Sequence, residues 1–122
     1  MATLKYNLNK NKLMTQREVL RRYAEDLGYL IASSISRKVL YALKLGHETP
    51  TSLSKFLKIS LSNISTKLGE LKRRGLIYCI NPERRKGRIY VITEKGEALL
   101  ESLPNGYKLE FNQDYEGEVK RL

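Results

Sequence analysis

The sequence has little of the chemistry that builds enzymes and metal centres. It contains one cysteine, Cys79, and one histidine, His47, among its 122 residues. One thiol cannot form an internal disulfide, and one thiol with one imidazole cannot supply the four ligands of a structural zinc site. No glycine-rich phosphate loop is visible, and no set of Ser, His and Asp is arranged for nucleophilic catalysis. We therefore expect a protein that is not an enzyme, binds no metal and no cofactor, and uses Cys79 as a small apolar residue.

Long hydrophobic runs are also missing. No apolar segment approaches the ~20 residues that a membrane-spanning helix needs. The first residues, MATLKYNLNKNK, lack the apolar centre of a secretion signal. The chain has 41% hydrophobic and 30% charged residues, which is typical of one globular domain. We expect a cytoplasmic protein with no membrane partner.

The balance of charge is strongly positive, with a formal net charge of +10 and a sequence pI of about 9.8. Most of this charge lies in residues 36–103, which hold 14 Lys and Arg against 6 Asp and Glu. Residues 1–35 have a net charge of +3 and residues 104–122 a net charge of −1. Positive charge concentrated on one segment favours a polyanionic partner over a general role in solubility.

Residues 51–75 have the pattern of two short helices joined by a turn. The first is expected from about residue 51 to residue 58, with Thr49 or Thr51 as its cap. Its apolar face consists of Leu53, Phe56 and Leu57. In the second helix, Ser60 or Ser62 can cap the start and Gly75 can end it. One face of this second helix is apolar at helical spacing and consists of Leu61, Ile64, Leu68 and Leu71.

After Gly75 the period changes from helical to alternating. Residues 76–80 and 88–92 are rich in β-branched and aromatic residues and are expected to pair as a hairpin. The connection between them contains the turn formers Pro82 and Gly87. Four cations, Arg84, Arg85, Lys86 and Arg88, and one anion, Glu83, lie in or beside this connection. The tip of the hairpin is therefore basic. The sequence predicts an α+β, mostly α, fold: a winged helix-turn-helix with a two-stranded β-hairpin wing and an added N-terminal helix.

Residues 34–103 resemble the winged-helix regulators of the MarR and ArsR families. The positions that carry the resemblance are Leu53, Leu57, Ser62, Ile64, Ser65, Leu68, Leu71, Gly75 and Leu76. The wing lacks the Asp-Arg-Arg signature of MarR-type wings, and residues 83–85 are its nearest equivalent. The resemblance implies a DNA-binding domain over residues 14–103. It also implies that helices at residues 15–31 and 94–103 are possible dimer elements.

In a winged helix, the second helix of the motif enters the major groove of duplex DNA. We expect the helix at about residues 62–74 to read bases, and the wing at residues 82–88 to hold the backbone or the minor groove. The expected contacts from the helix are Ser62, Asn63, Ser65, Thr66, Lys67, Lys72 and Arg73. The expected contacts from the wing are Arg84, Arg85, Lys86 and Arg88. Asn63 can pair with adenine and Lys67 can donate to guanine, whereas Ser65 can bond a phosphate instead.

The predicted helix at residues 15–31 begins with a capping-box pattern, Thr15 and Glu18. Its leucines repeat every seven residues at Leu13, Leu20 and Leu27. This stripe can pack on the helices of its own domain, join two copies of the chain, or do both. Gly28 can end or bend the helix early.

The remaining segments have simpler patterns. Residues 34–45 and 93–103 are predicted helices, and Thr93 caps the second of them. The apolar face of that second helix consists of Ala98, Leu99, Leu100 and Leu103. Residues 1–13 form a polar arm that can touch a DNA groove or fray. Residues 104–122 form a tail, in which alternation over residues 107–111 allows a short strand; the tail can pack on the domain, contact a partner or hang free.

The leading interpretation is a sequence-specific, double-stranded-DNA-binding transcription regulator that acts as a homodimer. The alternative is a winged-helix interaction module in a larger transcription or replication assembly. The charge of the wing favours DNA, because such a module more often exposes an apolar patch. RNA is less natural, since A-form grooves do not admit a reading helix. The single Cys79 and single His47 disfavour metal sensing, whereas a small apolar effector between two copies stays open.

Overall fold

The structure is a computed structural model, and it describes residues 15–107. Its elements are α2 (Gln16–Ala32), α3 (Ser34–Lys44), α4 (Pro50–Leu57), α5 (Leu61–Arg73), β1 (Ile77–Cys79), β2 (Tyr90–Ile92) and α6 (Glu94–Glu101). The two strands form an antiparallel sheet that pairs Ile77 with Ile92 and Cys79 with Tyr90. The predicted fold class, mostly helical with a two-stranded wing, is confirmed. The predicted arm at residues 1–13, Leu13 of the heptad, and the tail from residue 108 onward lie outside the described residues.

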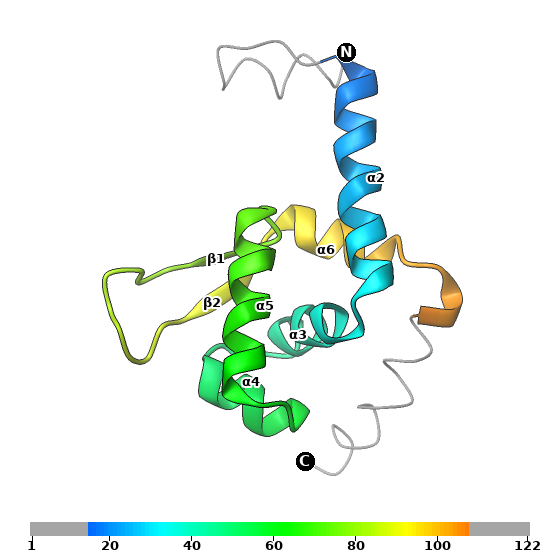
Figure 1. Ribbon diagram of the computed structural model, residues 1–122. Coiled ribbons are helices and arrows are strands. Elements are labelled where there is room, and N and C mark those ends of the chain that lie inside the picture. The colour runs from blue at the N-terminus through cyan, green and yellow to red at the C-terminus, as the bar shows by residue number, and fades with distance from the viewer. Residues whose placement is uncertain (1–14, 108–122) are drawn as a thin grey trace.

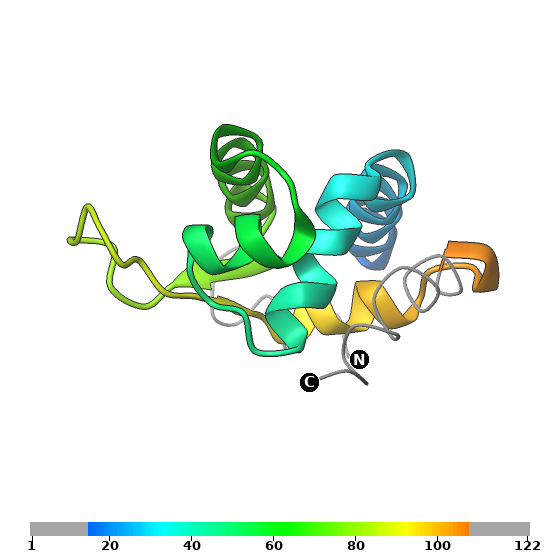
Figure 2. The ribbon, with the colours of Figure 1, turned by 90° about the horizontal axis from the view of Figure 1, so that it is seen from below.

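The helices form a body from which two elements project in different directions. The hairpin of β1 and β2 extends to one side of α5, and α2 rises from the body on the other side (Figure 1). A view turned by 90° shows the same separation, with α6 beneath α2 and far from the tip of the hairpin (Figure 2). The wing and the projecting part of α2 are therefore free to meet different partners. None of the helices within residues 15–107 has both the length and the hydropathy to cross a membrane.

Hydroxyl side chains at the N-caps fix where the helices begin. Thr15 and Glu18 form the predicted capping box: Glu18 N–H donates to Thr15 Oγ1 over 3.1 Å, and Thr15 N–H donates to Glu18 Oε1 over 3.0 Å. These bonds hold the pKa of Glu18 below its usual value, because they stabilise the carboxylate. Of the alternative caps, Thr49 serves α4 and Ser60 serves α5, and Thr93 caps α6 as predicted.

Helices α4 and α5 both begin and end one residue earlier than predicted. Helix α4 begins at Pro50 and not at Thr51, because proline is well tolerated in the first helical turn, where no intrahelical N–H bond is required. Helix α5 begins at Leu61 and not at Ser62, because Ser60 is the cap. Gly28 does not end α2, which continues to Ala32.

Both strands are shorter than the predicted ranges of residues 76–80 and 88–92. Leu76 belongs to the end of α5, because its N–H donates to Leu71 O over 3.0 Å while Gly75 N–H donates to Lys72 O over 3.0 Å. This is a Schellman motif, with Gly75 in the left-handed region at φ 76° as predicted for the residue that ends the helix. At the other end, Ile80 N–H still donates to Ile89 O over 2.9 Å, but Ile89 N–H donates to a side chain, Asn81 Oδ1, over 2.8 Å.

The core lies where α3, α4, α5 and α6 meet the base of the hairpin. Its most completely buried side chains are Leu30, Val39, Leu40, Leu53, Ile64, Leu68, Leu71, Leu76, Ile77 and Leu99. The predicted apolar faces of α4, α5 and α6 are thereby confirmed, with two corrections. Leu61 does not extend the stripe inward and is 49% exposed, and Ala98 of α6 is exposed. Leu103 is buried as predicted, although α6 ends before it, at Glu101.

Helix α2 packs on the body through its C-terminal half. Leu30 is buried, Leu27 and Tyr23 are half-buried against the core, and Tyr23 Oη contacts Ser102 Oγ after α6. Leu20, one heptad before Leu27, is 60% exposed. The stripe therefore packs on its own domain in its second half and remains uncovered at Leu20.

A buried carboxylate joins α2 to the end of α5 and to the start of α6. Asp26 is 7% exposed, and its oxygens contact Arg74 Nη1 at 2.8 Å and Lys95 Nζ at 2.7 Å. Arg74 caps the C-terminal end of α5, and Lys95 lies in the first turn of α6. Lys95 Nζ also donates to Arg74 O over 3.0 Å. One side chain of α2 therefore fixes the relative positions of three helices.

Replacing Asp26 tests this junction. Asp26→Asn should lower the free energy of unfolding by about 1–3 kcal/mol, because two cations lose their shared anion at a buried site. The neighbouring Glu25→Gln, at an exposed position of the same helix, should change it by less than about 0.5 kcal/mol. Urea unfolding of both variants measures the difference. Equal unfolding free energies for the two variants would show that the junction is energetically unimportant.

Candidate nucleic-acid interface

Helix α5 presents a polar face because its apolar side chains are committed to the core. Ile64, Leu68 and Leu71 are buried, which turns the opposite side of the helix outward. Four of the predicted base-reading residues are exposed there: Ser62, Asn63, Ser65 and Thr66. Thr66 Oγ1 donates to Ser62 O over 3.0 Å, so the hydroxyl proton of Thr66 is already used within the helix. These short side chains leave the first two turns of α5 accessible to a partner.

Lys67 lies toward the side of α5 that faces α2. Its Nζ is 3.3 Å from Glu70 Oε1, and the same oxygen accepts a 2.6 Å hydrogen bond from Tyr29 Oη of α2. The bond from Tyr29, followed by that from Lys67, lowers the pKa of Glu70. Burial and the adjacent Glu70 raise the pKa of Tyr29 to about 12. Lys67 therefore differs from the other predicted base-reading residues at the start of α5: it is half-buried and is paired with a carboxylate. To contact a base, Lys67 would have to leave Glu70.

The cations at the end of α5 separate into two groups. Lys72 and Arg73 are exposed, as expected for contacts with phosphates, and Lys72 lines the groove beside the wing. Arg74 is bound to Asp26 and stacks on Tyr29, with its guanidinium carbon 4.1 Å from the ring centre. Tyr29, Glu70, Arg73 and Arg74 line a cavity of about 380 Å³ between α2 and α5.

The wing tip is basic and internally braced. Arg84, Arg85 and Lys86 are exposed, and Arg88 is half-buried with its Nε donating to Arg84 O. Arg84 Nε in turn donates to Lys86 O over 3.3 Å. Two guanidinium groups that were predicted to contact DNA, those of Arg84 and Arg88, therefore donate hydrogen bonds to carbonyl groups of the loop itself.

Asn81 closes the loop of the wing. Its Oδ1 accepts from Ile89 N–H over 2.8 Å, and its Nδ2 donates to Gly87 O over 3.1 Å. The amide thus bridges the two ends of the loop that carries the wing cations. Sequence reasoning identified the turn formers but missed this residue, because a side-chain bond across eight residues has no periodic signal.

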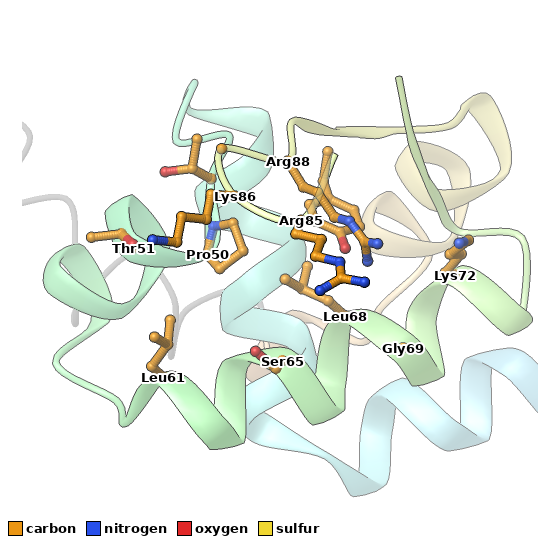
Figure 3. Close-up of a pocket in the computed structure, with 13 residues that line it drawn as sticks. Pro50, Thr51, Leu61, Ser65, Leu68, Gly69, Lys72, Arg85, Lys86 and Arg88 are labelled. Atoms are coloured by element: carbon orange, nitrogen blue, oxygen red, sulfur yellow. The ribbon is translucent and has the colours of Figure 1, made fainter. Parts of the chain in front are cut away.

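Some of the predicted helix and wing residues come together around one groove. This groove, of about 670 Å³, is lined by Thr49, Pro50, Thr51, Leu61, Ser65, Leu68, Gly69, Lys72, Arg85, Lys86, Gly87, Arg88 and Tyr90. Arg85 and Arg88 lie on the wing side facing α5, and Lys86 lies beside Pro50 and Thr51 (Figure 3). Of the predicted site residues, Ser65, Lys72, Arg85, Lys86 and Arg88 line this groove.

The start of α4 was missed as part of this site. Thr49, Pro50 and Thr51 lie at the N-terminus of α4 and line the groove. A helix N-terminus carries partial positive charge and favours a phosphate. The available signal was the cap itself: Thr49 followed by proline marks where that helix end lies, although the sequence cannot place it beside the wing.

The lone histidine and cysteine have structural surroundings. His47 is half-buried and stacks on Phe56 with ring centres 4.0 Å apart, and its Nδ1 is 3.1 Å from Ser52 Oγ. Cys79 is half-buried, and its Sγ is 3.5 Å from Asn81 Oδ1. Residues 15–107 contain no cluster of three or more His, Cys, Asp or Glu that could hold a metal ion.

A helix-turn-helix followed by a basic hairpin, with a cationic groove between the second helix and the hairpin, defines a winged-helix protein. The winged helix-turn-helix family profile matches residues 32–110, and the chain belongs to this family. A search of curated protein sequences gives no match.

Solved structures with a similar fold include several MarR-family regulators. A MarR family transcription regulator shares 24% identity over 94% of this chain and 80% of that chain, with a TM-score of 0.55. Wild-type MarR from E. coli in its apo form shares 19% identity over 90% and 93% of the two chains, with a TM-score of 0.55. A mutant MarR from E. coli complexed with operator DNA shares 24% identity over 77% and 71%, with a TM-score of 0.55. At these identities the similarity establishes the fold.

Proposed function

We propose that this protein is a sequence-specific, double-stranded-DNA-binding transcription regulator that acts in the cytoplasm as a homodimer. The observation that carries the proposal is the groove between α5 and the wing, where Lys72, Arg85, Lys86 and Arg88 converge. Among the described residues that line this groove, none is acidic. A concave surface with cations on both walls suits a polyanion, and the exposed helix beside it suits the major groove of B-form DNA.

The two walls of the site divide the work of binding. Ser62, Asn63, Ser65 and Thr66 offer hydrogen-bonding groups at the start of α5, where a recognition helix meets base edges. The wing offers mainly charge, which supplies affinity through release of counterions but little choice of sequence. Lys72 and Arg73, at the end of α5, extend the charged surface. A mutant MarR from E. coli, a structure with a similar fold, is complexed with operator DNA, which supports duplex DNA as the partner of this fold.

Dimer formation is proposed through α2; α6, the other predicted dimer element, has Leu99 and Leu100 buried in its own domain. Leu20, in the N-terminal half of α2, is 60% exposed, and this half of the helix stands clear of the body (Figure 1). Exposed leucine on a helix of heptad pattern favours a second copy as its partner. In this arrangement residues 14–103 form the DNA-binding and dimer unit. A dimer with two-fold symmetry would read a near-palindromic site.

One observation favours a second candidate function. Tyr78 and Ile80, on the same face of the wing, are 51% and 53% exposed. An apolar wing face of this kind suits an interaction module within a larger assembly. The two candidate functions predict different behaviour with isolated duplex DNA. A regulator should bind the duplex with an affinity that falls as the salt concentration rises, whereas an interaction module should not bind it.

Mutation of helix and wing should have different consequences. Replacing Asn63 by Ala should cost about 1–3 kcal/mol on the preferred duplex and relax the choice of one or two base pairs. Replacing Lys67 by Ala should cost less, because Lys67 already has Glu70 as a partner. Replacing Arg84, Arg85 and Lys86 together should weaken preferred and random duplexes alike, and should reduce the log–log salt slope by about 0.9 for each phosphate that the wing no longer neutralises.

Affinities for a preferred duplex, selected from a random library, and for a random duplex across a salt series measure these effects. A wing variant that keeps the wild-type salt slope would contradict the division of work. So would an Asn63 variant that binds both duplexes more weakly by the same factor.

Replacing Leu20 tests the dimer. Leu20→Glu should shift a dimer to a monomer of 14.1 kDa in sedimentation velocity at micromolar concentration, because it places a carboxylate in an apolar contact. Leu45→Glu is the matched control, since Leu45 is an exposed leucine (38%) at the C-cap of α3, and this variant should remain dimeric. A wild-type protein that stays monomeric both free and on DNA would refute the dimer.

A further inference from the structure

Gly69 is a glycine in the middle of the helix that faces the proposed partner. It lies in the third turn of α5, within Leu61–Arg73, and lines the groove between α5 and the wing. Glycine inside a helix is less stable than alanine, because it loses more backbone freedom on folding and adds no side-chain contact. Its presence here therefore needs a reason.

The fold of the chain itself does not require this glycine. A Cβ added to Gly69 would have one neighbour within 4 Å, Arg73 Nη1 at 3.5 Å, which is an ordinary contact with the end of an exposed side chain. The backbone of Gly69 is helical and not left-handed. Gly96 shows the contrast: a Cβ there would lie 2.3 Å from Leu76 O, so close packing of α6 excludes any side chain.

The surroundings of Gly69 are cationic and concave. Lys72 lies one turn further along α5, and Arg85 and Arg88 lie across the groove on the wing (Figure 3). A winged helix that places α5 in the major groove and the wing in the neighbouring minor groove has one sugar-phosphate strand between the two elements. The groove that contains Gly69 occupies this position between α5 and the wing.

We propose that one sugar-phosphate strand of duplex DNA lies in this groove, and that Gly69 is the point at which the backbone of α5 approaches that strand most closely. The inference rests on the proposed function and adds a positioning residue to it. The lack of a Cβ lets the helix come nearer to the strand, which brings the cations on both walls within reach of phosphates. The start of α4, at Thr49 and Thr51, places a partial positive charge at the same groove.

Gly69→Ala should change stability and binding in opposite directions. The melting temperature should rise by about a few degrees, because alanine favours the helix and, among the described residues, the new methyl group meets only the end of the Arg73 side chain at an ordinary contact distance. Affinity for duplex DNA should fall by about tenfold or more, because the methyl group intrudes on a close contact. The fall should be similar for preferred and random duplexes, since the strand in the groove carries no base information.

Two further variants sharpen the test. Gly28→Ala is the matched control: Gly28 is an exposed glycine within α2, and a Cβ there has no neighbour within 4 Å. It should raise the melting temperature in the same way and leave the affinity unchanged. Gly69→Lys adds a positive charge to the groove and should nevertheless bind more weakly than wild type, because the space is needed for the strand itself.

Thermal melting and fluorescence-anisotropy titration of the full chain with both duplexes measure these effects, and sedimentation confirms that every variant keeps the wild-type oligomeric state. Three results would overturn the proposal: Gly69→Ala that binds as tightly as wild type, Gly69→Ala that loses affinity only for the preferred duplex, or Gly69→Lys that binds more tightly. A wild-type protein that binds no duplex would refute the proposed function itself, whereas wild-type binding with an unaffected Gly69→Ala refutes only the placement of the strand.

Discussion

The burial of Ile64, Leu68 and Leu71 is the constraint on which the rest of the site depends. These three side chains are almost fully excluded from solvent, and removing any of them from the core would cost about 2–5 kcal/mol. Their burial fixes the rotation of α5 about its axis. That rotation exposes Ser62 and Thr66, turns Ser65 and Lys72 toward the wing, and leaves Lys67 on the side of α2. The reading face is thus set by what the opposite face must bury.

The same helix is held at its other end by α2. Tyr29 bonds Glu70, Arg74 stacks on Tyr29, and Asp26 binds both Arg74 and Lys95. These contacts join the proposed dimer helix to the C-terminal half of the proposed reading helix. A rotation of α2 in the dimer would therefore carry α5 with it, so the separation of the two reading helices would follow from the packing of α2. The wing, by contrast, is fixed at its base by strand pairing and at its tip by the amide of Asn81.

Much of the fold follows from local pattern. The apolar stripes of α4 and α5, the capping box of Thr15 and Glu18, and the end of α5 at Gly75 depend on neighbours within one or two turns, and all were predicted. The choice of Ser60 over Ser62 was not predictable, because both hydroxyls stand near the same helix start. The strands were predicted too long, because the N–H of Leu76 bonds the end of α5 and the N–H of Ile89 bonds the side chain of Asn81.

The site was predictable in composition and less so in arrangement. The exposed residues of α5 and the cations of the wing carry signals of type and position. The pairs Tyr29–Glu70 and Asp26–Arg74 join residues 41 and 48 positions apart, and no period or spacing links them. The contribution of α4 to the groove depends on the position of the hairpin, whose Tyr90 N–H donates to Glu48 O just before α4 over 2.9 Å. Gly69 was visible in the sequence, but its meaning required the knowledge that, within residues 15–107, only the end of the Arg73 side chain lies near the position of an added Cβ.

The central claim is that duplex DNA binds on α5, the wing and the start of α4 together. An NMR titration of the isotope-labelled full chain with a preferred duplex tests it most directly. Backbone amide signals of the non-proline residues in the ranges 49–51, 61–73 and 81–88 should shift together at the same DNA concentrations, while those of the exposed part of α2, residues 16–22, should change little. Shifts concentrated on α2 or on the outer wing face at Tyr78 and Ile80, with α5 unperturbed, would contradict the account.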